Sequence, residues 1–257
     1  MTVREIEQKL VKLAAEYPPR MAAEQMSDIP RIAFNISLVL PAEKPLDKMV
    51  VCDIGGGIGL FSVGCAAVGF GKSILVDDFA DQVNLELGDS ILDLHRRHGV
   101  QVISRDVMAQ GLKDLRTSFD VVTCFDSMEH WHSSPKSLFH ELIAMMNPRG
   151  LLVVGVPNCV NLRKRLTVPL GRGKWSPMQE WYEPAVFRAH VREPDVDDLW
   201  YIARDLKLQN VRILGRNWLG YRSNSKWMRR VTGLVDPLMQ FRPSLCSNIY
   251  LVGEKAG

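Results

Sequence analysis

The sequence predicts a single doubly wound α/β domain. Short apolar runs alternate with helical patterns from residue 49 to residue 155, and a Gly-rich turn follows the first run. Apolar residues make up 46% of the chain and charged residues 24%, as in ordinary globular proteins, which excludes a disordered or fibrous chain. Alternating strands and helices imply parallel βαβ units, and such sheets bind ligands at the carboxyl ends of their strands.

The first 45 residues are predicted to form an N-terminal helical cap. Apolar residues recur at helical spacing over residues 3–17, and Pro18-Pro19 ends that helix. A second helical stretch covers roughly residues 22–40. The prolines within 41–45 then mark a linker into the first strand.

Residues 46–160 carry the repeated strand and helix pattern and are predicted to form the ligand-binding core. The apolar runs that predict strands are 49–53, 73–77, 100–104, 119–125 and 150–155. The stretches with helical spacing are 58–69, 82–98 and 135–146. The helix 82–98 is expected to end at Gly99, because glycine favours the position after a helix.

Residues 161–257 are predicted to hold a lid or substrate segment and the last two strands of the same domain. Residues 161–195 lack a clear period and contain Pro, Gly, Trp and Arg, as an inserted lid would. Residues 195–206 return to helical spacing. Strands are expected at 210–214 and 248–252, separated by a basic, aromatic-rich insertion.

Charge is distributed unevenly along the chain. Residues 161–257 hold 17 Lys/Arg and 9 Asp/Glu, a balance of +8, so residues 1–160, with 15 and 20, carry −5. The N-terminus lacks the apolar run of a secretory signal, and no run approaches the ~18 residues of a membrane span. Five scattered cysteines without C-x-x-C spacing argue against a zinc site and a disulfide framework. We therefore expect a cytoplasmic protein.

The Gly-rich segment Val50-Val-Cys-Asp-Ile-Gly-Gly-Gly-Ile-Gly59 runs from a strand into a helix. In such a turn a ligand approaches the main chain closely. The dinucleotide pattern G-x-G-x-x-G fails here, because its sixth place is Leu60 or Ser62. The pattern that remains is an acid followed by alternating glycines: Asp53, Gly55, Gly57 and Gly59.

This pattern resembles the first motif of the class I S-adenosylmethionine methyltransferases, and later segments resemble that family in the same order. The second strand ends in Asp77-Asp78, and the third is followed by Arg105-Asp106-Val107. Residues 119–130, which end in Glu129-His130, resemble the ubiquinone-biosynthesis-type O-methyltransferases. Residues 146–158 resemble the Leu-Lys-Pro-Gly-Gly turn and fifth strand of that group. The resemblance covers residues 47–160.

The resemblance implies a Rossmann-like, seven-stranded sheet of order 3-2-1-4-5-7-6 and S-adenosylmethionine as the cofactor. It implies that an acid after the second strand binds the ribose hydroxyls, and we favour Asp77 over Asp78 by register. Asp106 would lie beside the adenine amino group. The full set of predicted cofactor residues is Asp53, Gly55, Gly57, Gly59, Asp77, Asp78, Asp106, Val107, Phe125 and Asp126.

Methyl transfer to a hydroxyl benefits from a general base, and an imidazole that titrates near neutrality suits that task. His130 is our first candidate, with Glu129 as its neighbour, and His190 in the lid is the second. The alternative is that these residues only shape their loops through hydrogen bonds. No ligand cluster in the sequence compels a metal ion, so none is predicted.

Two basic segments point to the acceptor. Residues 161–174 hold five basic residues and residues 211–230 hold six, neither with an acid, and aromatic residues interleave with them. They suit an anionic small molecule, a glycan or lipid precursor, or an anionic membrane surface, although a solvated face would look the same. Nucleic acid is disfavoured because no RNA-binding module is recognisable.

The function predicted from these observations is O-methylation of such an acceptor. The alternatives are N-methylation of a small molecule, a nicotinamide-dependent oxidoreductase, and a non-catalytic subunit that binds S-adenosylmethionine. The missing third glycine of the dinucleotide pattern disfavours the oxidoreductase.

Overall fold

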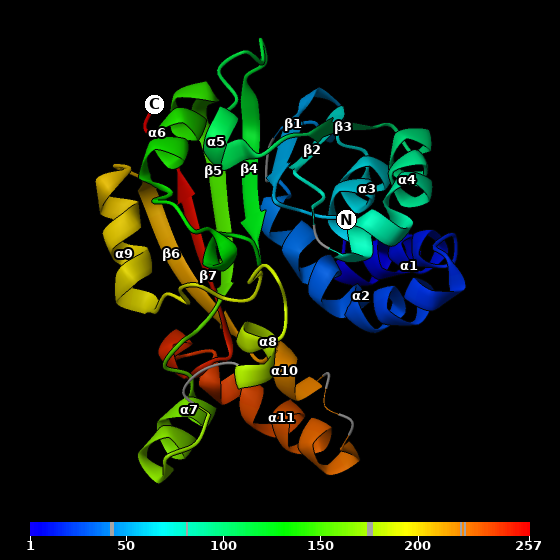
Figure 1. Ribbon diagram of the computed structural model, residues 1–257. Coiled ribbons are helices and arrows are strands. Elements are labelled where there is room, and N and C mark those ends of the chain that lie inside the picture. Colours follow the sequence, from blue (N-terminus) through cyan, green and yellow to red (C-terminus); the bar gives the residue numbers. More distant parts are fainter. Residues whose placement is uncertain (42–43, 81, 174–176, 222, 224) are drawn as a thin grey trace.

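The computed structural model describes residues 1–41, 44–80, 82–173, 177–221, 223 and 225–257. At its centre lies one sheet with the strand order β3-β2-β1-β4-β5-β7-β6, which confirms the predicted order (Figure 1). The strands are β1 (Val50–Ile54), β2 (Lys72–Asp77), β3 (Val100–Ser104), β4 (Phe119–Phe125), β5 (Met146–Pro157), β6 (Gln209–Arg216) and β7 (Asn248–Glu254).

The sheet is mixed. Strands β1 to β5 pair in parallel, whereas β7 runs antiparallel to both β5 and β6. The carboxyl ends of β1, β2, β3 and β4 therefore share one edge of the sheet. The last strand is nevertheless a central strand, buried along most of its length between β5 and β6.

Helices cover both faces of the sheet and bury two apolar cores. The helices α1 (Val3–Ala14), α2 (Pro19–Val39), α3 (Leu60–Val68) and α4 (Gln82–Arg97) cover one face. The other face carries α5 (Val107–Gln110), α6 (Lys136–Met145) and α9 (Val196–Asp205). Successive strand residues alternate between the cores, as Val51 and Cys52 of β1 do.

The two helices of the N-terminal cap differ from their predicted bounds near Pro18 and Pro19. Helix α1 begins with a capping box at Thr2 and ends at Ala14, short of the predicted residue 17. Helix α2 begins at Pro19, three residues before the prediction, because proline at the first helical position already has a helical φ and needs no amide donor. The proline pair that ends one helix therefore also begins the next.

Helices occupy the lid, which was predicted to lack a clear period, and the insertion between the last two strands, for which no helix was predicted. The lid contains α7 (Leu162–Thr167), the 3-10 turn η3 (Val168–Leu170) and α8 (Met178–Tyr182). The insertion between β6 and β7 contains α10 (Trp218–Tyr221) and α11 (Lys226–Met239). These five elements gather beyond the tip of β4, and we call them the lower lobe (Figure 1). Of the predicted basic and aromatic positions, Lys174, Trp175 and Arg222 lie outside the described residues.

Three further 3-10 turns are η1 (Leu46–Lys48), η2 (Met128–His130) and η4 (Pro243–Leu245). The turn η2 directly follows β4 and carries Glu129 and His130. In the described part of the chain, no helix is both long and apolar enough to cross a membrane.

Candidate active site

A cavity of about 710 Å³ opens at the carboxyl ends of β1 to β4, a size typical of ligand pockets. The Gly-rich loop, one face of α2 and lid residues 186–188 form its walls. All ten residues predicted to bind the cofactor line this cavity, and so does His130. Glu129 and His190 are not among the lining residues, although the His190 ring contacts the ring of His130. The structure thus brings the predicted residues to one place.

The Gly-rich loop exposes its backbone to the cavity. Gly55 and Gly57 have φ values of +68° and +56°, a conformation that favours glycine. A Cβ on Gly55 would lie 1.8 Å from Oγ of Ser127, so this glycine permits close packing of two loops. A Cβ on Gly57 would meet no atom within 4 Å, because this residue faces open space. A ligand can therefore contact the main chain at Gly57.

Asp53 lies beneath the loop. Its carboxylate accepts hydrogen bonds from the hydroxyls of Ser62 (2.9 Å) and Thr123 (2.7 Å), and only 2% of the residue is exposed. Burial raises its pKa to about 6, although the two hydroxyl donors favour the charged form. Asp53 thus ties β1 to α3 and β4, and it positions the loop from below.

Asp77 and Asp78 follow β2 and differ in their contacts. The Asp77 carboxylate accepts hydrogen bonds from the amides of Gly57 (2.9 Å) and Phe79 (2.7 Å), which ties β2 to the Gly-rich loop. Asp78 accepts a hydrogen bond from the amide of Ala80, and its Oδ2 lies 3.7 Å from the guanidinium of Arg188. Carboxylate oxygens have several lone pairs, so both residues retain the capacity to accept hydroxyl donors.

Asp106 is the N-cap of α5, a helix that the sequence did not predict. Its Oδ1 accepts hydrogen bonds from the amides of Met108 (3.0 Å) and Ala109 (3.1 Å). The next residue, Val107, is buried against the sheet. The carboxylate of Asp106 is therefore held in a fixed orientation at the cavity wall.

Helix α2 contributes polar residues that the sequence analysis missed. Gln25, Asp28, Arg31 and Asn35 all line the cavity. Their spacings of three and four residues put them on one helix face, and this periodicity is the signal that could have revealed them. Oδ1 of Asn35 is buried and makes no hydrogen bond to any described residue. A buried, unpaired acceptor at a cavity wall calls for a ligand donor.

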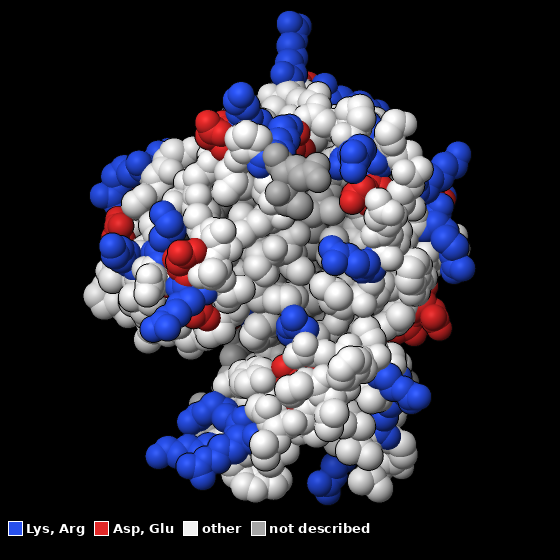
Figure 2. Space-filling model, turned by 180° about the vertical axis from the view of Figure 1, so that it is seen from behind, with Lys and Arg blue, Asp and Glu red and all other residues white. Residues whose placement is uncertain are grey.

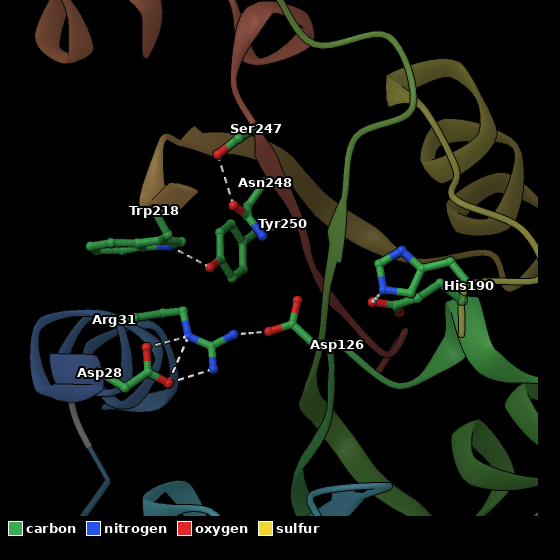
Figure 3. Close-up of polar contacts among 9 residues, drawn as sticks. Asp28, Arg31, Asp126, His190, Trp218, Ser247, Asn248 and Tyr250 are labelled. Atoms are coloured by element: carbon green, nitrogen blue, oxygen red, sulfur yellow. Dashed lines mark hydrogen bonds and ion pairs between the residues drawn. The ribbon is translucent and has the colours of Figure 1, made fainter. Parts of the chain in front are cut away.

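Arg31 links the cap to the loop after β4 (Figure 3). Its guanidinium bonds to both carboxylate oxygens of Asp28, with Nε 2.9 Å from Oδ1, and it forms a further ion pair with Asp126. Asp126 has φ +48°, a strained conformation for a residue with a side chain. The ion pair fixes this strained turn, which precedes η2 and His130.

His130 presents a neutral imidazole to the cavity. Its Nδ1 lies 2.8 Å from the carbonyl oxygen of Arg188. A carbonyl only accepts hydrogen bonds, so Nδ1 carries the proton and Nε2 of the neutral ring is an acceptor. Burial lowers the pKa of His130 from its usual 6.5. The ring is therefore uncharged at neutral pH.

His190 packs edge-on against His130, with ring centroids 4.8 Å apart. Its Nδ1 lies 2.7 Å from Oε1 of Glu193, which also forms an ion pair with Lys164. Burial alone would raise the pKa of Glu193, but its bonds to His190 and Lys164 lower that pKa to about 2. An ionised Glu193 thus orients the His190 ring in the lid.

Glu129 is the most unusual residue of the site. It is 1% exposed, and neither carboxylate oxygen has a hydrogen-bond partner among the described residues. Oε1 lies 4.0 Å from Nε2 of His190. Burial raises the pKa of Glu129 to about 8. The carboxyl group is thus mostly protonated at neutral pH.

Glu129, His130 and His190 each offer one ligand atom, and these atoms lie within 4.8 Å of one another. Two imidazoles and a carboxylate are donors that hold divalent transition-metal ions. All three residues were predicted as catalytic candidates, but their meeting as a possible ligand set was not predicted, because His190 comes from the lid, far along the chain from Glu129 and His130.

The cavity fits a cationic nucleoside. Three aspartates (Asp77, Asp78 and Asp106) stand at strand ends, where they can accept from ribose hydroxyls and an adenine amino group. Asn35 adds its unpaired oxygen, and Gly57 leaves the backbone open. Seven acidic and three basic residues line the cavity, so its field favours a positive ligand such as a sulfonium. These features match the residues implied by the family resemblance.

Comparisons with known proteins agree with this site. The profile of the methyltransferase domain family matches residues 23–213, which is most of the chain. No curated protein matches the chain by sequence.

Solved methyltransferases share the fold. One from Archaeoglobus fulgidus is 20% identical over 88% of this chain and 91% of its own, with a TM-score of 0.52. Magnesium protoporphyrin IX methyltransferase from Synechocystis, solved with S-adenosylhomocysteine, is 14% identical. The match covers 91% of this chain and 84% of that enzyme, with a TM-score of 0.53. Phosphoethanolamine N-methyltransferase 2 from Haemonchus contortus, solved with S-adenosylmethionine, is 16% identical. The match covers 88% of this chain and 52% of that enzyme, with a TM-score of 0.55.

At these identities the likeness to solved structures shows the fold, whereas the family profile covers the Gly-rich loop, β1 to β5 and the lid. The nicotinamide alternative is thereby set aside. The chain belongs to the methyltransferase domain family, is a class I S-adenosylmethionine-dependent methyltransferase, and uses S-adenosylmethionine as its cofactor.

Proposed function

We propose that this enzyme methylates a hydroxyl oxygen of an anionic acceptor, either a small molecule or a glycan- or lipid-linked precursor, with His130 as general base. The observation that carries the proposal is the contact between Nδ1 of His130 and the carbonyl oxygen of Arg188. Because Nδ1 donates to the carbonyl of Arg188, Nε2 is left to accept a proton, and His130 is one of the residues that line the cavity.

S-adenosylmethionine supplies an electrophilic methyl group on a sulfonium, whose leaving group is neutral. The protein therefore has two tasks: to align the acceptor oxygen and to remove its proton. The hydroxyl proton passes to Nε2 of His130 as the oxygen–carbon bond forms, and the ring becomes an imidazolium. Its Nδ1–H bond to Arg188 holds the ring in place throughout.

Glu129 and His190 act as positioning residues in this proposal. The His190 ring packs against the His130 ring in a T-shaped arrangement and is itself oriented by Glu193. Glu129, mostly protonated at neutral pH, adds no negative charge that would raise the pKa of His130. The base therefore remains neutral and ready to accept a proton.

An anionic acceptor is supported by the basic residues at the rim. Arg188 lines the cavity with half of its side chain exposed, and its nearest acid, Asp78, is 3.7 Å away. We place the reaction in the cytoplasm, where five unpaired cysteines would stay reduced.

The proposal is tested by following the labelled methyl group of S-adenosylmethionine into matched acceptors. Sugar and lipid-precursor alcohols, their amine analogues, and phosphorylated and dephosphorylated forms of each would be compared. We expect label in the phosphorylated alcohols, recovered as an O-methyl product by mass spectrometry. Label recovered only in amines would replace the proposal with N-methylation.

Chelation separates the general base from a metal. If His130 acts as a free base, dialysis against EDTA leaves the turnover number unchanged, because Glu129, His130 and His190 hold no ion. Activity lost with EDTA and restored by one divalent metal would instead assign these three side chains as ligands that acidify the acceptor hydroxyl. Retained affinity for S-adenosylmethionine in the chelated enzyme would show that the loss is not unfolding.

Asp77 is expected to matter more than Asp78 for cofactor binding. Asp77→Asn removes a charged acceptor that also braces Gly57, so the Kd for S-adenosylmethionine should rise at least about tenfold, the effect of a lost charged hydrogen bond. Asp78→Asn is the matched control, with an expected change below about threefold. Calorimetric titration measures both. The reverse ranking would assign the ribose contact to Asp78.

A further inference from the structure

Helix α11 turns its apolar side to solvent. Trp227, Leu234 and Leu238 are 68%, 79% and 69% exposed, and Phe241, just beyond the helix, is 83% exposed. Spacings of seven, four and three residues put these side chains along one stripe. A surface helix of a globular protein ordinarily has the opposite orientation, with its apolar stripe against the core.

The buried residues of α11, Thr232 and Asp236, are polar. Asp236, 5% exposed, accepts hydrogen bonds from Asn217 (2.7 Å), Tyr221 (3.2 Å) and Gln240 (2.7 Å). Rotation of the helix to bury its apolar stripe would break these bonds to a buried carboxylate. The hydrogen bonds of Asp236 therefore fix the orientation of α11, with its apolar stripe toward solvent.

The other helices of the lower lobe repeat this pattern. Leu166 of α7 and Leu170 of η3 are 63% and 77% exposed, one helical turn apart. Helix α8 exposes three more large side chains: Met178, Trp181 and Tyr182. Side chains exposed to this degree stand on convex tips, whereas protein partners bind most strongly in well-packed pockets.

Positive charge surrounds the exposed apolar side chains. The exposed basic residues of α7, η3 and α11 and the turns that follow them are Arg163, Arg165, Arg172, Lys226, Arg229, Arg230 and Arg242. Residues 161–173 and 225–242 contain one acid, the buried Asp236, while Glu180 and Glu183 lie at α8. Figure 2 shows the lower lobe in white and blue, with red near its junction with the rest of the molecule.

We propose that the lower lobe docks on the surface of an anionic lipid bilayer, with the apolar tips among the lipid headgroups and the Lys and Arg side chains against lipid phosphates. Protruding Trp, Phe and Leu beside Lys and Arg are the composition of interfacial membrane-binding helices. An anionic bilayer matches the charge, and it accepts separate convex tips, which a single protein groove does not.

Docking would bring the cavity to the bilayer. Residues 183–185 join α8 to Val186, Phe187 and Arg188, and these three line the cavity. A docked lobe therefore holds the cavity rim near the lipid headgroups, within reach of an acceptor anchored in the membrane. The proposal does not depend on which atom is methylated or on the role of His130.

Flotation with vesicles tests the proposal on the full chain. We expect binding to phosphatidylcholine vesicles that contain roughly one third phosphatidylglycerol, little binding to phosphatidylcholine alone, and release as salt rises. Lys226→Glu with Arg230→Glu should weaken binding at least about 25-fold, at about fivefold per charge lost. Leu234→Ser with Leu238→Ser should also weaken it, and this loss should persist at low salt.

Control variants carry matched changes outside the lobe. Arg4→Glu with Lys12→Glu alters two exposed charges on α1, and Tyr201→Ser removes an exposed aromatic ring from α9. Both should bind vesicles like the wild type. Unaltered affinity for S-adenosylmethionine would show that each variant is folded.

Two results would overturn the proposal. One is a wild-type protein that does not bind the anionic vesicles at low salt. The other is a wild-type dimer in light scattering that Leu234→Ser with Leu238→Ser converts to monomer without changing vesicle binding, because the stripe would then cover a second copy of the chain.

Discussion

Replacing His130 by alanine should lower the turnover number by about 10²- to 10⁴-fold while the Kd for S-adenosylmethionine stays within about threefold, because the loss of a general base affects proton transfer rather than binding. The variant keeps the Gly-rich loop and the aspartates at the strand ends. Exogenous imidazole should restore part of the rate, since the smaller side chain would leave space at the cavity wall. Steady-state kinetics and calorimetry measure the two effects separately.

His132→Ala is the matched control for this experiment. His132 also lines the cavity and contacts a lid carbonyl, with Nε2 3.3 Å from the oxygen of Phe187, but it lies on the exposed side of the loop. Its replacement should change turnover less than about tenfold. Equal losses in both variants would point to a general distortion of the loop and would remove His130 from the role of base.

The pH dependence of turnover provides a second readout of the same residue. The base works only when it is unprotonated, so the rate should rise with pH through the pKa of His130, which burial places below 6.5. The His130→Ala variant should lose this inflection. An inflection that persists would assign the titration to another group.

The architecture of the core could be predicted from the sequence because its signals are local. The apolar runs place β1 to β4 within a residue of their observed bounds, and the Gly-rich loop, Asp77 and Asp106 follow strands whose ends must meet at one edge. The strand order came from the family resemblance, because local patterns carry no information on how β7 inserts between β5 and β6.

The remainder of the site depends on packing between distant segments. The polar face of α2 looks solvated in the sequence, and only its placement over the cavity makes Asn35 and Arg31 wall residues. His190 meets His130 because the lid folds back over the loop after β4. The exposed stripe of α11 has the periodicity of a buried face, so the sequence alone could not assign its direction.

Replacing Glu129 by glutamine should make the protein more stable at alkaline pH than the wild type. The folded protein holds this carboxyl with a pKa of about 8, against 4.5 in the unfolded chain. Between these pH values the unfolded chain binds fewer protons than the folded protein, so the stability that Glu129 provides is complete below pH 4.5 and is lost as pH rises through 8.

Each unit of pKa difference corresponds to about 1.4 kcal/mol, so the free energy of unfolding should fall by roughly 4 to 5 kcal/mol across that interval. The glutamine side chain would mimic the protonated acid and remove this loss. Urea unfolding at pH 5 and pH 8.5 measures the effect as the difference between wild type and variant. Asp53, whose pKa is raised to about 6, also makes stability depend on pH. Because both proteins contain Asp53, its contribution cancels in this difference.

Glu180→Gln, at an exposed position of α8, is the matched control and should leave the free energy of unfolding unchanged at both pH values. The result also bears on the chemistry of the site. The difference in unfolding free energy between wild type and Glu129→Gln could instead be the same at pH 8.5 as at pH 5. That result would mean that the Glu129 carboxylate is ionised in the folded protein and that a positive charge compensates it. A metal cation held by Glu129, His130 and His190 would then neutralise this carboxylate. Removal of that cation with a chelator should make the stability of the wild type fall again as pH rises from 5 to 8.5.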